Sequence, residues 1–346
     1  MTFVVPIAAI LLAILVDWRW GDPPNRLHPV VAMGHWIAWT RRCGLKWRSN
    51  IARFWVGALS LAVGVLATGA IGWVIERISS EFPLLMNVLI QAAVLKCTLS
   101  VRSLAAAANA VALALSKRDL ASARQHLAYH LVSRDVSNLD ESEVAAATVE
   151  SVAENTSDSV IAPLVYFVIA GLPGALIYRY VNTSDAMLGY RTPDLEWLGK
   201  PAARLDDLLN LIPSRLTAVL MLLVGPAGRL VATAGVRRSR AASIWMRDHA
   251  LTSSPNAGHP MSAAAGLLGV VLAKRDHYRL GDGQSLPTVA TIGAMNSLLY
   301  RTVAAGVLVA AAWIGMAAWV DMAEFIGIAE WIGMTEWCSP GAEGGT

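Results

Sequence analysis

Acidic side chains recur in this chain at a spacing that could hold a divalent cation. Glu150, Glu154 and Asp158 fall at positions i, i+4 and i+8, so a helix would place all three on one face. Like charges on one face repel one another unless a positive group lies among them. Because carboxylate and amide oxygens are ligands for hard cations, this face and the neighbouring Asn155 indicate a metal site. The alternative is a solvated helix face without a ligand.

The four-residue string Asn-Thr-Ser-Asp occurs twice, at residues 155–158 and 182–185. The apolar run between the copies, residues 160–180, is interrupted by Gly171-Leu-Pro-Gly174. A straight helix would hold the copies about 36 Å apart, at about 1.5 Å per residue. A bend at the interruption would bring them together on one side, and we predict this bend and a shared site. Asn182 and Asp185 would then face the first polar cluster.

Two further polar segments stand out in the apolar sequence. Gly21-Asp-Pro-Pro-Asn-Arg-Leu-His-Pro29 stops an apolar helix and fixes a tight turn that presents Asp22 and His28, or it is a rigid loop at the membrane surface. In residues 253–260, small side chains around Asn256 and Gly258 leave backbone N–H groups open, as in anion-binding loops. A polar turn would explain that segment equally well.

No standard catalytic motif accompanies these clusters. The chain contains no P-loop, GxGxxG, HExxH or Ser-His-Asp order. A polar stretch with Arg191, Arg204, Asp206 and Asp207 follows the second string. The residue types alone therefore indicate a site that gathers carboxylates, amides and a few arginines, which suits a metal-bound anionic ligand.

The composition is that of an integral membrane protein. Of the 346 residues, 55% are hydrophobic and 15% charged, and the mean hydropathy is +0.49. The net charge of +3 is too small to suggest nucleic acid as a partner. Cys43, Cys97 and Cys338 show no CxxC or Cys/His spacing, so we expect them to be unpaired. The apolar N-terminus lacks basic residues and a small-residue cleavage site, so we expect a retained helix.

We predict an all-α, polytopic membrane protein with additional cytoplasmic helices. Four apolar segments are expected to cross the membrane fully, beginning near Phe3, Phe54, Leu84 and Val303. Two further runs, residues 160–180 and 216–234, are broken centrally by Gly and Pro, the second at Gly225-Pro-Ala-Gly228. Irregular backbone at membrane depth is tolerated where it is buried in protein or lines a wet cavity. We therefore expect both runs to be re-entrant or kinked.

The distribution of Lys and Arg sets the expected sidedness. We expect one membrane-embedded domain over residues 1–320, with cytoplasmic segments at 17–53, 100–158, 182–213 and 236–290. The acidic tail, residues 321–346, has no Lys or Arg and should lie outside. If both broken runs crossed fully, residues 182–213 would face outside instead. Asn138-Leu-Asp-Glu141 resembles a capping box that opens the helix with the acidic face.

Five segments follow one another in a characteristic order: Gly21-Asp-Pro-Pro with His28-Pro-Val, Glu150-Ser-Val-Ala-Glu-Asn-Thr-Ser-Asp158, Val181-Asn-Thr-Ser-Asp-Ala-Met-Leu-Gly-Tyr-Arg191, Ala203-Arg-Leu-Asp-Asp-Leu-Leu-Asn210 and Ser254-Pro-Asn-Ala-Gly-His-Pro-Met261. Together they resemble the CbiB/CobD family, the adenosylcobinamide-phosphate synthases of cobalamin biosynthesis. The resemblance extends over nearly the whole chain. Ser159, Ser184 and His259 depart from it, because Gly, an apolar residue and Trp are common there.

The resemblance implies an amide ligation that depends on ATP and Mg²⁺. The carboxylate of adenosylcobyric acid, a corrinoid, would be joined to (R)-1-amino-2-propanol or its O-phosphate. Because a carboxylate is a poor acyl donor, it must first be activated, which calls for a metal and cations around phosphate. The implied catalytic residues are Glu150, Glu154, Asp158, Asp185 and His28, with His28 or a glutamate taking the amine proton. The implied metal ligands are Glu154, Asp158 and Asp185, and the implied cofactor-binding residues are Asn155, Asn182, Arg191, Arg204, Asn256 and Gly258.

The implied surroundings are the cytoplasmic membrane of the cell, its lipid bilayer and other membrane enzymes of the corrinoid pathway. Two other classes of protein stay open. A transporter would also use broken helices, although the polar clusters here sit at segment ends. A non-catalytic membrane scaffold would explain the apolar segments but not the clustered carboxylates.

Overall fold

Helices form nearly all of the structure, which confirms the predicted fold class. The computed structural model describes residues 3–24, 26, 28–225, 238–275, 277–282 and 285–331, without the side chains of 321–331. Its helices are α1 (Val4–Trp20), α2 (Pro29–Gly44), α3 (Asn50–Ser79), α4 (Leu84–Lys96), α5 (Val101–Ser116), α6 (Leu120–His130), α7 (Glu141–Thr156), α8 (Ala162–Leu188), α9 (Glu196–Leu209), α10 (Leu211–Val224), α11 (Arg238–Asp248), α12 (Gly258–Leu268) and α13 (Val289–Trp331). A π-helical turn, η2 (Ser157–Ile161), joins α7 to α8. Strands β1 (Leu272–Lys274) and β2 (Tyr278–Leu280) pair in a short antiparallel hairpin.

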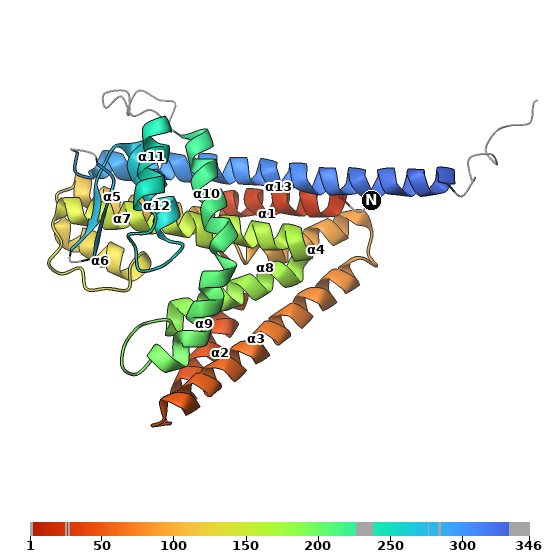
Figure 1. The fold of residues 1–346 in the computed structure, drawn as a ribbon, viewed down its shortest axis with the longest axis horizontal. Helices are drawn as coiled ribbons and strands as arrows, with labels where there is room; N and C mark the ends of the chain where they lie inside the picture. Colours follow the sequence, from red (N-terminus) through yellow and green to blue (C-terminus); the bar gives the residue numbers. More distant parts are fainter. Residues whose placement is uncertain are drawn as a thin grey trace, which may run out of the picture.

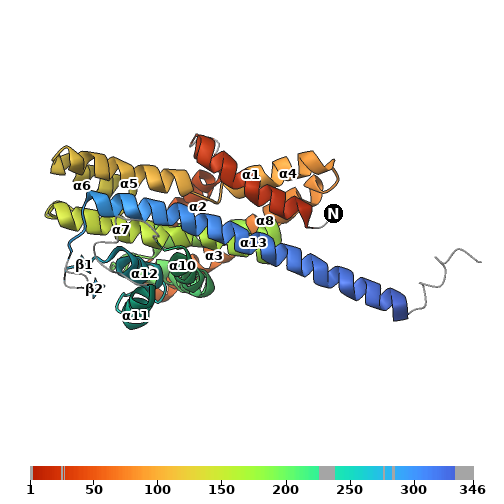
Figure 2. The same ribbon diagram turned by 90° about the horizontal axis from the view of Figure 1, so that it is seen from above.

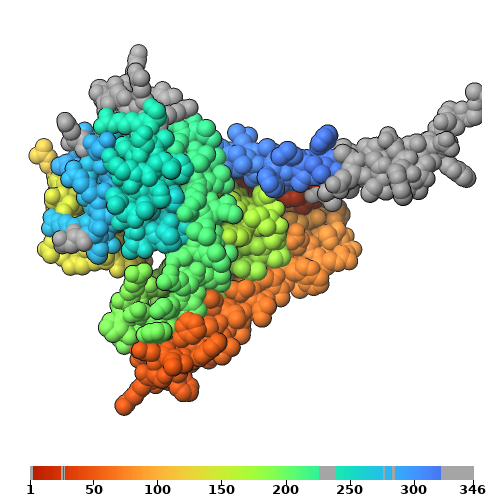
Figure 3. All heavy atoms as spheres, viewed as in Figure 1, coloured from red at the N-terminus to blue at the C-terminus, as the bar shows by residue number. Residues whose placement is uncertain are grey.

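Helices α1, α7 and α13 run along the long axis, α3 runs obliquely to them, and several shorter elements gather at one end (Figure 1). Helices α1 and α13 lie side by side along the long axis, with α4 packed against α1 (Figures 1 and 2). At the end away from the N-terminus, α5, α6, α7, α12 and the β hairpin lie together (Figure 1). Helices α10, α11 and α12 pack against one another and form a continuous surface on the face seen in Figure 3.

Among the described residues, four helical stretches are long and apolar enough to cross a membrane, and the bent pair α9 and α10 would be a fifth if it is one span. They are α3, α4 with α5 (Leu84–Ser116), α7 through α8 (Glu141–Leu188) and the first part of α13 (Val289–Val320). Three of them match predicted crossings. The fourth predicted crossing is α1, whose 17 residues extend about 26 Å, at the lower end of the length that crosses a bilayer. The remaining stretch contains the Gly-Pro-Gly interruption and is bent there.

Helix α3 shows how the protein separates a lipid-compatible face from a packed one. Its apolar side chains Leu59, Leu66 and Trp73 are exposed, as expected of a face that meets lipid. The opposite face carries glycines, and a Cβ at Gly64 would overlap the ring of Tyr180 on α8. Small residues allow such close approach where the surrounding lipid supplies no hydrophobic driving force. Helix α3 therefore fixes the position of the second half of α8.

Helix α8 is bent where the sequence predicts. Ala170 (φ −142°, ψ 25°) and Gly171 (φ 60°, ψ −151°) leave the helical conformation, and the positive φ favours glycine. The two arms lie side by side, because the rings of Tyr166 and Tyr178 stack across them with centroids 5.2 Å apart. In a straight helix these two residues, 12 positions apart, would lie about 18 Å apart, so the chain turns back between them. The run is thus a hairpin, and the predicted bend at residues 171–174 is confirmed.

The second broken run falls largely outside the described residues. Helix α10 ends at Val224, just before Gly225, and residues 226–237, which include the rest of the predicted break, are not described. The bend that is described in this region lies earlier, where α9 and α10 meet at an angle of 45°. The chain next appears as α11, which packs beside α10 and α12.

The capping box lies two residues later than the sequence suggested. The Asp140 side chain accepts a hydrogen bond from the Glu143 N–H at 2.8 Å, and the Glu143 carboxylate accepts one from the Asp140 N–H at 2.9 Å. Asn138 stays in the preceding turn, because the helix begins where both reciprocal bonds form. The cap fixes the start of α7, and hence the side of the helix on which its acids lie.

Candidate functional site

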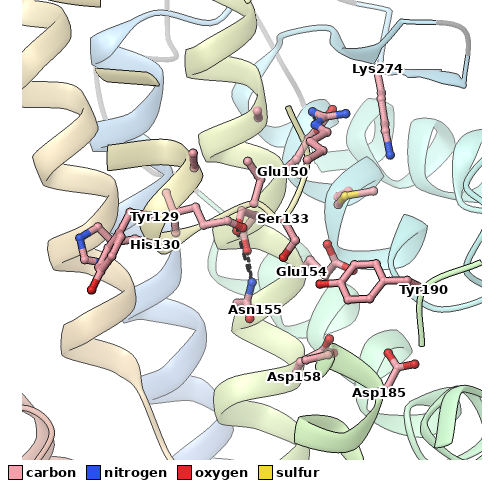
Figure 4. Close-up of a pocket in the computed structure, with 18 of the residues that line it drawn as sticks. Tyr129, His130, Ser133, Glu150, Glu154, Asn155, Asp158, Asp185, Tyr190 and Lys274 are labelled. Atoms are coloured by element: carbon pink, nitrogen blue, oxygen red, sulfur yellow. Dashed lines mark hydrogen bonds and ion pairs between the residues drawn. The ribbon is translucent and has the colours of Figure 1, made fainter. Parts of the chain in front are cut away.

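A cavity of about 680 Å³ opens where α7, η2 and the second arm of α8 meet the β hairpin and the α6–α7 loop (Figure 4). Its polar lining comes from segments far apart in the sequence: Tyr129, His130, Ser133, Arg134, Glu150, Ser151, Glu154, Asn155, Asp158, Asn182, Asp185, Tyr190, Lys274 and Tyr278. Such a size is within the range of small-molecule sites.

Four acidic side chains line this cavity, as the sequence predicted. Glu150 and Glu154 project from α7, Asp158 from η2, and Asp185 from α8 (Figure 4). The π-helical turn at Asp158 interrupts the α-helical register, a feature that is frequent at functional sites. Among the described residues, Glu154, Asp158 and Asp185 have no partner in an ion pair. Several carboxylates in one partly buried cavity are unfavourable without a cation, so the cavity suits a positive ligand.

The two Asn-Thr-Ser-Asp strings meet at this cavity because the α8 hairpin returns the second string to the first. The Asn155 amide donates to the Ser151 carbonyl oxygen at 2.9 Å, and the Ser159 hydroxyl donates to the Asn155 amide oxygen at 3.3 Å. The Asn182 amide donates to the Asp206 carboxylate at 3.2 Å, behind the cavity wall. A common cavity for both strings, the central prediction from the sequence, is therefore what the fold produces.

Cations at the rim were not foreseen from the sequence. Arg134, in the α6–α7 loop, lies 3.5 Å from the Glu150 carboxylate. Lys274, on β1, lines the cavity from the opposite element (Figure 4). Tyr278 of β2 is its cross-strand partner and also lines the cavity. The only sequence signal was the cluster of basic residues around position 275, which follows a buried apolar helix. No local pattern pointed from that cluster to the acids.

His28 is placed elsewhere, which corrects its predicted membership of the site. It is the N-cap of α2, where its Nδ1 accepts a hydrogen bond from the Val30 N–H at 3.2 Å. Its Nε2 lies 4.0 Å from Asp22, whose carboxylate pairs with the buried Lys96. Burial lowers the pKa of His28, and the Asp22 carboxylate opposes this effect. The turn has a structural role at the junction of α1, α4 and α5.

The predicted anion ligands also lie outside the cavity. Arg191 and Arg204 are exposed and do not line it. Asn256 is buried, and its amide donates to the Asp207 carbonyl oxygen at 2.7 Å. A Cβ at Gly258 would lie 2.0 Å from the His249 carbonyl oxygen, so this glycine permits close packing at the start of α12. Both residues are buried, and the N–H groups of Asn256 and Ala257 donate to the Ser254 hydroxyl, so the structure gives Asn256 and Gly258 packing roles.

The acids do not form a closed metal site on their own. Within the described part of the chain, no group of three or more His, Cys, Asp or Glu side chains is placed to hold a metal ion. The donor set nevertheless fits Mg²⁺, which usually takes one or two carboxylates and completes its shell with water and substrate phosphates. Glu154, Asp158 and Asp185 supply those oxygens around one cavity.

The fold and the cavity together define a helical membrane protein with a polar, acid-lined site at one end of its bundle. A model of the CobD/Cbib protein family matches residues 10–297, and the chain belongs to this family. The CobD/CbiB family is a family of cobalamin biosynthesis proteins.

Relatives confirm the family over most of the chain. A probable cobalamin biosynthesis protein CobD from Methanothermobacter thermautotrophicus is 37% identical, over 88% of this chain and 98% of its own length. Cobalamin biosynthesis proteins CobD from Dehalococcoides mccartyi and Geobacter metallireducens are each 42% identical, over 79% and 82% of this chain and 85% and 86% of their own lengths. No solved structure matches this chain.

Proposed function

We propose that this protein joins the free carboxylate of adenosylcobyric acid to (R)-1-amino-2-propanol or its O-phosphate through an amide bond, with hydrolysis of ATP. The observation that carries the proposal is the convergence of both Asn-Thr-Ser-Asp strings and the α7 acids on one cavity with cations at its rim. The membership of a cobalamin biosynthesis family supports the substrate class.

The proposed reaction has two steps. A carboxylate oxygen of the corrinoid attacks the γ-phosphorus of ATP, the bond from that phosphorus to the bridging oxygen breaks, and an acyl phosphate and ADP result. The nitrogen of the neutral amine then attacks the acyl carbon, inorganic phosphate leaves, and the nitrogen gives up one proton.

The residues of the cavity divide these tasks. Arg134 and Lys274 hold phosphate oxygens from the rim. Glu150 would accept the amine proton, a role supported by its buried Oε1, which has no hydrogen-bond partner among the described residues. Mg²⁺, held by one or two of the carboxylates of Glu154, Asp158 and Asp185 together with phosphate oxygens, would offset the negative charge of the phosphates.

The reaction itself is the test of the proposal. Purified protein in detergent is incubated with adenosylcobyric acid, ATP, Mg²⁺ and each amine in turn, and the products are read by mass spectrometry. We expect a corrinoid amide and an equal amount of ADP. A transporter or a non-catalytic scaffold would form neither product. The two amines tested separately identify the preferred substrate.

The protein is proposed to act in the cytoplasmic membrane of the cell, with the cavity on the side that holds ATP. The apolar helices support a bilayer as the surroundings. Other membrane enzymes of the corrinoid pathway are proposed neighbours, since a large substrate would then pass between them at the membrane surface.

A further inference from the structure

A second cavity, of about 520 Å³, lies on the other side of the β hairpin from the acid-lined cavity. The start of α7, the hairpin and the segment before α13 form its walls. Among the described residues, Lys274 is the one that lines both cavities. The hairpin is held in place by Leu272 and Leu280, which are paired across the strands and fully buried. The second cavity is therefore a fixed neighbour of the proposed site.

The charges around this second cavity leave it positive. Its two acids are already engaged, because Glu143 pairs with Arg275, and Asp282 lies 3.2 Å from Arg240. Lys274 and Arg279 form no ion pair or side-chain hydrogen bond with any residue that the structure describes. Two cations without partners at the edge of a cavity are suited to an anion.

The remaining lining is mostly apolar. Val271, Ala146 and Pro287 are buried, and Ala273 and Leu286 present apolar groups to the opening. A cavity with an apolar interior and a few placed charges is typical of a site for a ligand with a flat apolar part and a polar end. The apolar interior and the positive edge therefore suit a ligand that has an apolar part and an anionic part.

We propose that the second cavity binds the base of a nucleoside triphosphate, whose phosphates pass Lys274 and enter the acid-lined cavity. This inference rests on the proposed ATP-dependent function and places the nucleotide within it. The base lies on Ala273 and Leu286, and the ammonium of Lys274 meets the phosphates at the junction of the two cavities. Figure 4 shows the Lys274 side chain extending from β1 toward the acids.

Binding measurements on the full-length protein in detergent test this placement without any need for turnover. Lys274→Ala and Ala273→Trp should each raise the Kd of ATP with Mg²⁺ at least tenfold, the first by removing charge and the second by filling the cavity. Lys274→Arg should stay within about threefold of wild type, because it keeps the charge. The matched control is Lys117→Ala, an exposed lysine at the end of α5 that lines neither cavity.

Competition with ATP shows whether the site recognises the nucleoside or only phosphate. Adenosine and AMP should compete with ATP in wild type, whereas inorganic phosphate should compete only weakly. Unchanged ATP affinity in both Lys274→Ala and Ala273→Trp would overturn the inference. It would also be overturned if Ala273→Trp raised the KM of the phosphorylated amine and left the KM of ATP unchanged. If amide is still formed in either case, the proposed function stands without this placement.

Discussion

At the scale of single residues, Asp158 lines the cavity that both Asn-Thr-Ser-Asp strings share. It comes from the π-helical turn, and the other string approaches it through Asn182 and Asp185. The π-helical turn lets the acid reach the cavity while the chain continues directly into the α8 hairpin. Asp158 therefore lines a cavity, whereas the alternative from the sequence was a helix face exposed to solvent.

Asp158→Asn should lower the rate of amide formation at least tenfold, which corresponds to about 1.4 kcal/mol of transition-state stabilisation. The physical reason is the loss of one charged oxygen ligand for Mg²⁺. Titration of the activity with Mg²⁺ should show a higher requirement. Asp194→Asn, at an exposed position outside the cavity, is the control. Normal activity with normal Mg²⁺ dependence would remove Asp158 from the site.

His259 provides a prediction about stability and pH. Its Nδ1 accepts a hydrogen bond from the Trp245 indole at 2.9 Å, and its ring stacks on His249. Burial, with Arg215 and His249 nearby, lowers the pKa of His259 to about 4. The unfolded chain therefore binds a proton more readily than the folded one between about pH 6.5 and pH 4. Stability from this group is present above pH 6.5 and falls as the pH drops toward 4.

Apparent Tm values of the protein in detergent between pH 7.5 and pH 4 measure this effect. The wild type should lose more stability over this range than His259→Gln, which can accept the same hydrogen bond but does not titrate. The difference in the free energy of unfolding should reach about 3 kcal/mol at most, from about 1.4 kcal/mol per pH unit. Parallel curves for the two proteins would show that His259 does not contribute.

At the scale of elements, the α8 hairpin controls whether the second string reaches the first. Its turn depends on Gly171, whose φ of 60° is costly for other residues. An added Cβ there would lie 2.6 Å from the Glu76 carboxylate oxygens of α3, so the turn is also confined by a neighbour. The conformation of the turn therefore depends on glycine at this position.

Gly171→Ala should destabilise the protein by about 1–3 kcal/mol and lower the rate of amide formation, because the second arm and Asp185 would shift together. Thermal unfolding and the amide assay measure the two effects. Gly293→Ala on α13 is the matched control, since a Cβ there meets nothing within 4 Å. The control should be neutral or slightly stabilising, as alanine favours helix. If Gly171→Ala left both stability and amide formation unchanged, the turn would not require glycine at position 171.

At the scale of the whole molecule, the hairpin implies that both strings face the same side of the membrane. Ser157 and Ser184 are buried, so exposed positions near the strings report better on sidedness. Tyr129 and Tyr190 are exposed at the cavity, and Ser80 is exposed between α3 and α4, away from it. Single cysteines at these three positions, in a background without native cysteines, can be labelled with an impermeant reagent.

Labelling of intact and opened cells should place positions 129 and 190 on the same, cytoplasmic side and position 80 on the other. The reason is that α8 turns back at Gly171, while α3 and α4 reach the far end of the bundle. Cysteine 80 should react in intact cells, and the other two only after the cells are opened. Labelling of positions 129 and 190 from opposite sides would mean that α8 crosses fully.

Local features of the sequence determined the class of the protein and the acids of the cavity. Long apolar stretches are local, so most of the crossings could be predicted from composition, and α1 differs only in length. The spacing of Glu150, Glu154 and Asp158 is also local, because a helix repeats every 3.6 residues. The bend at Gly171 was predictable because only a residue without Cβ fits its conformation.

Only the tertiary structure decided which distant residues join those acids. Arg134 and Lys274 enter the cavity because a loop and a hairpin dock on α7, and no local pattern encodes where a loop docks. The same long-range packing excludes His28 and Asn256, whose polar groups are used to cap α2 and to hold α9. Polar residues at a turn look alike in sequence whether they bind a ligand or satisfy backbone groups. Their surroundings in three dimensions settle the difference, since a buried amide with its hydrogen bonds already made has none left to offer.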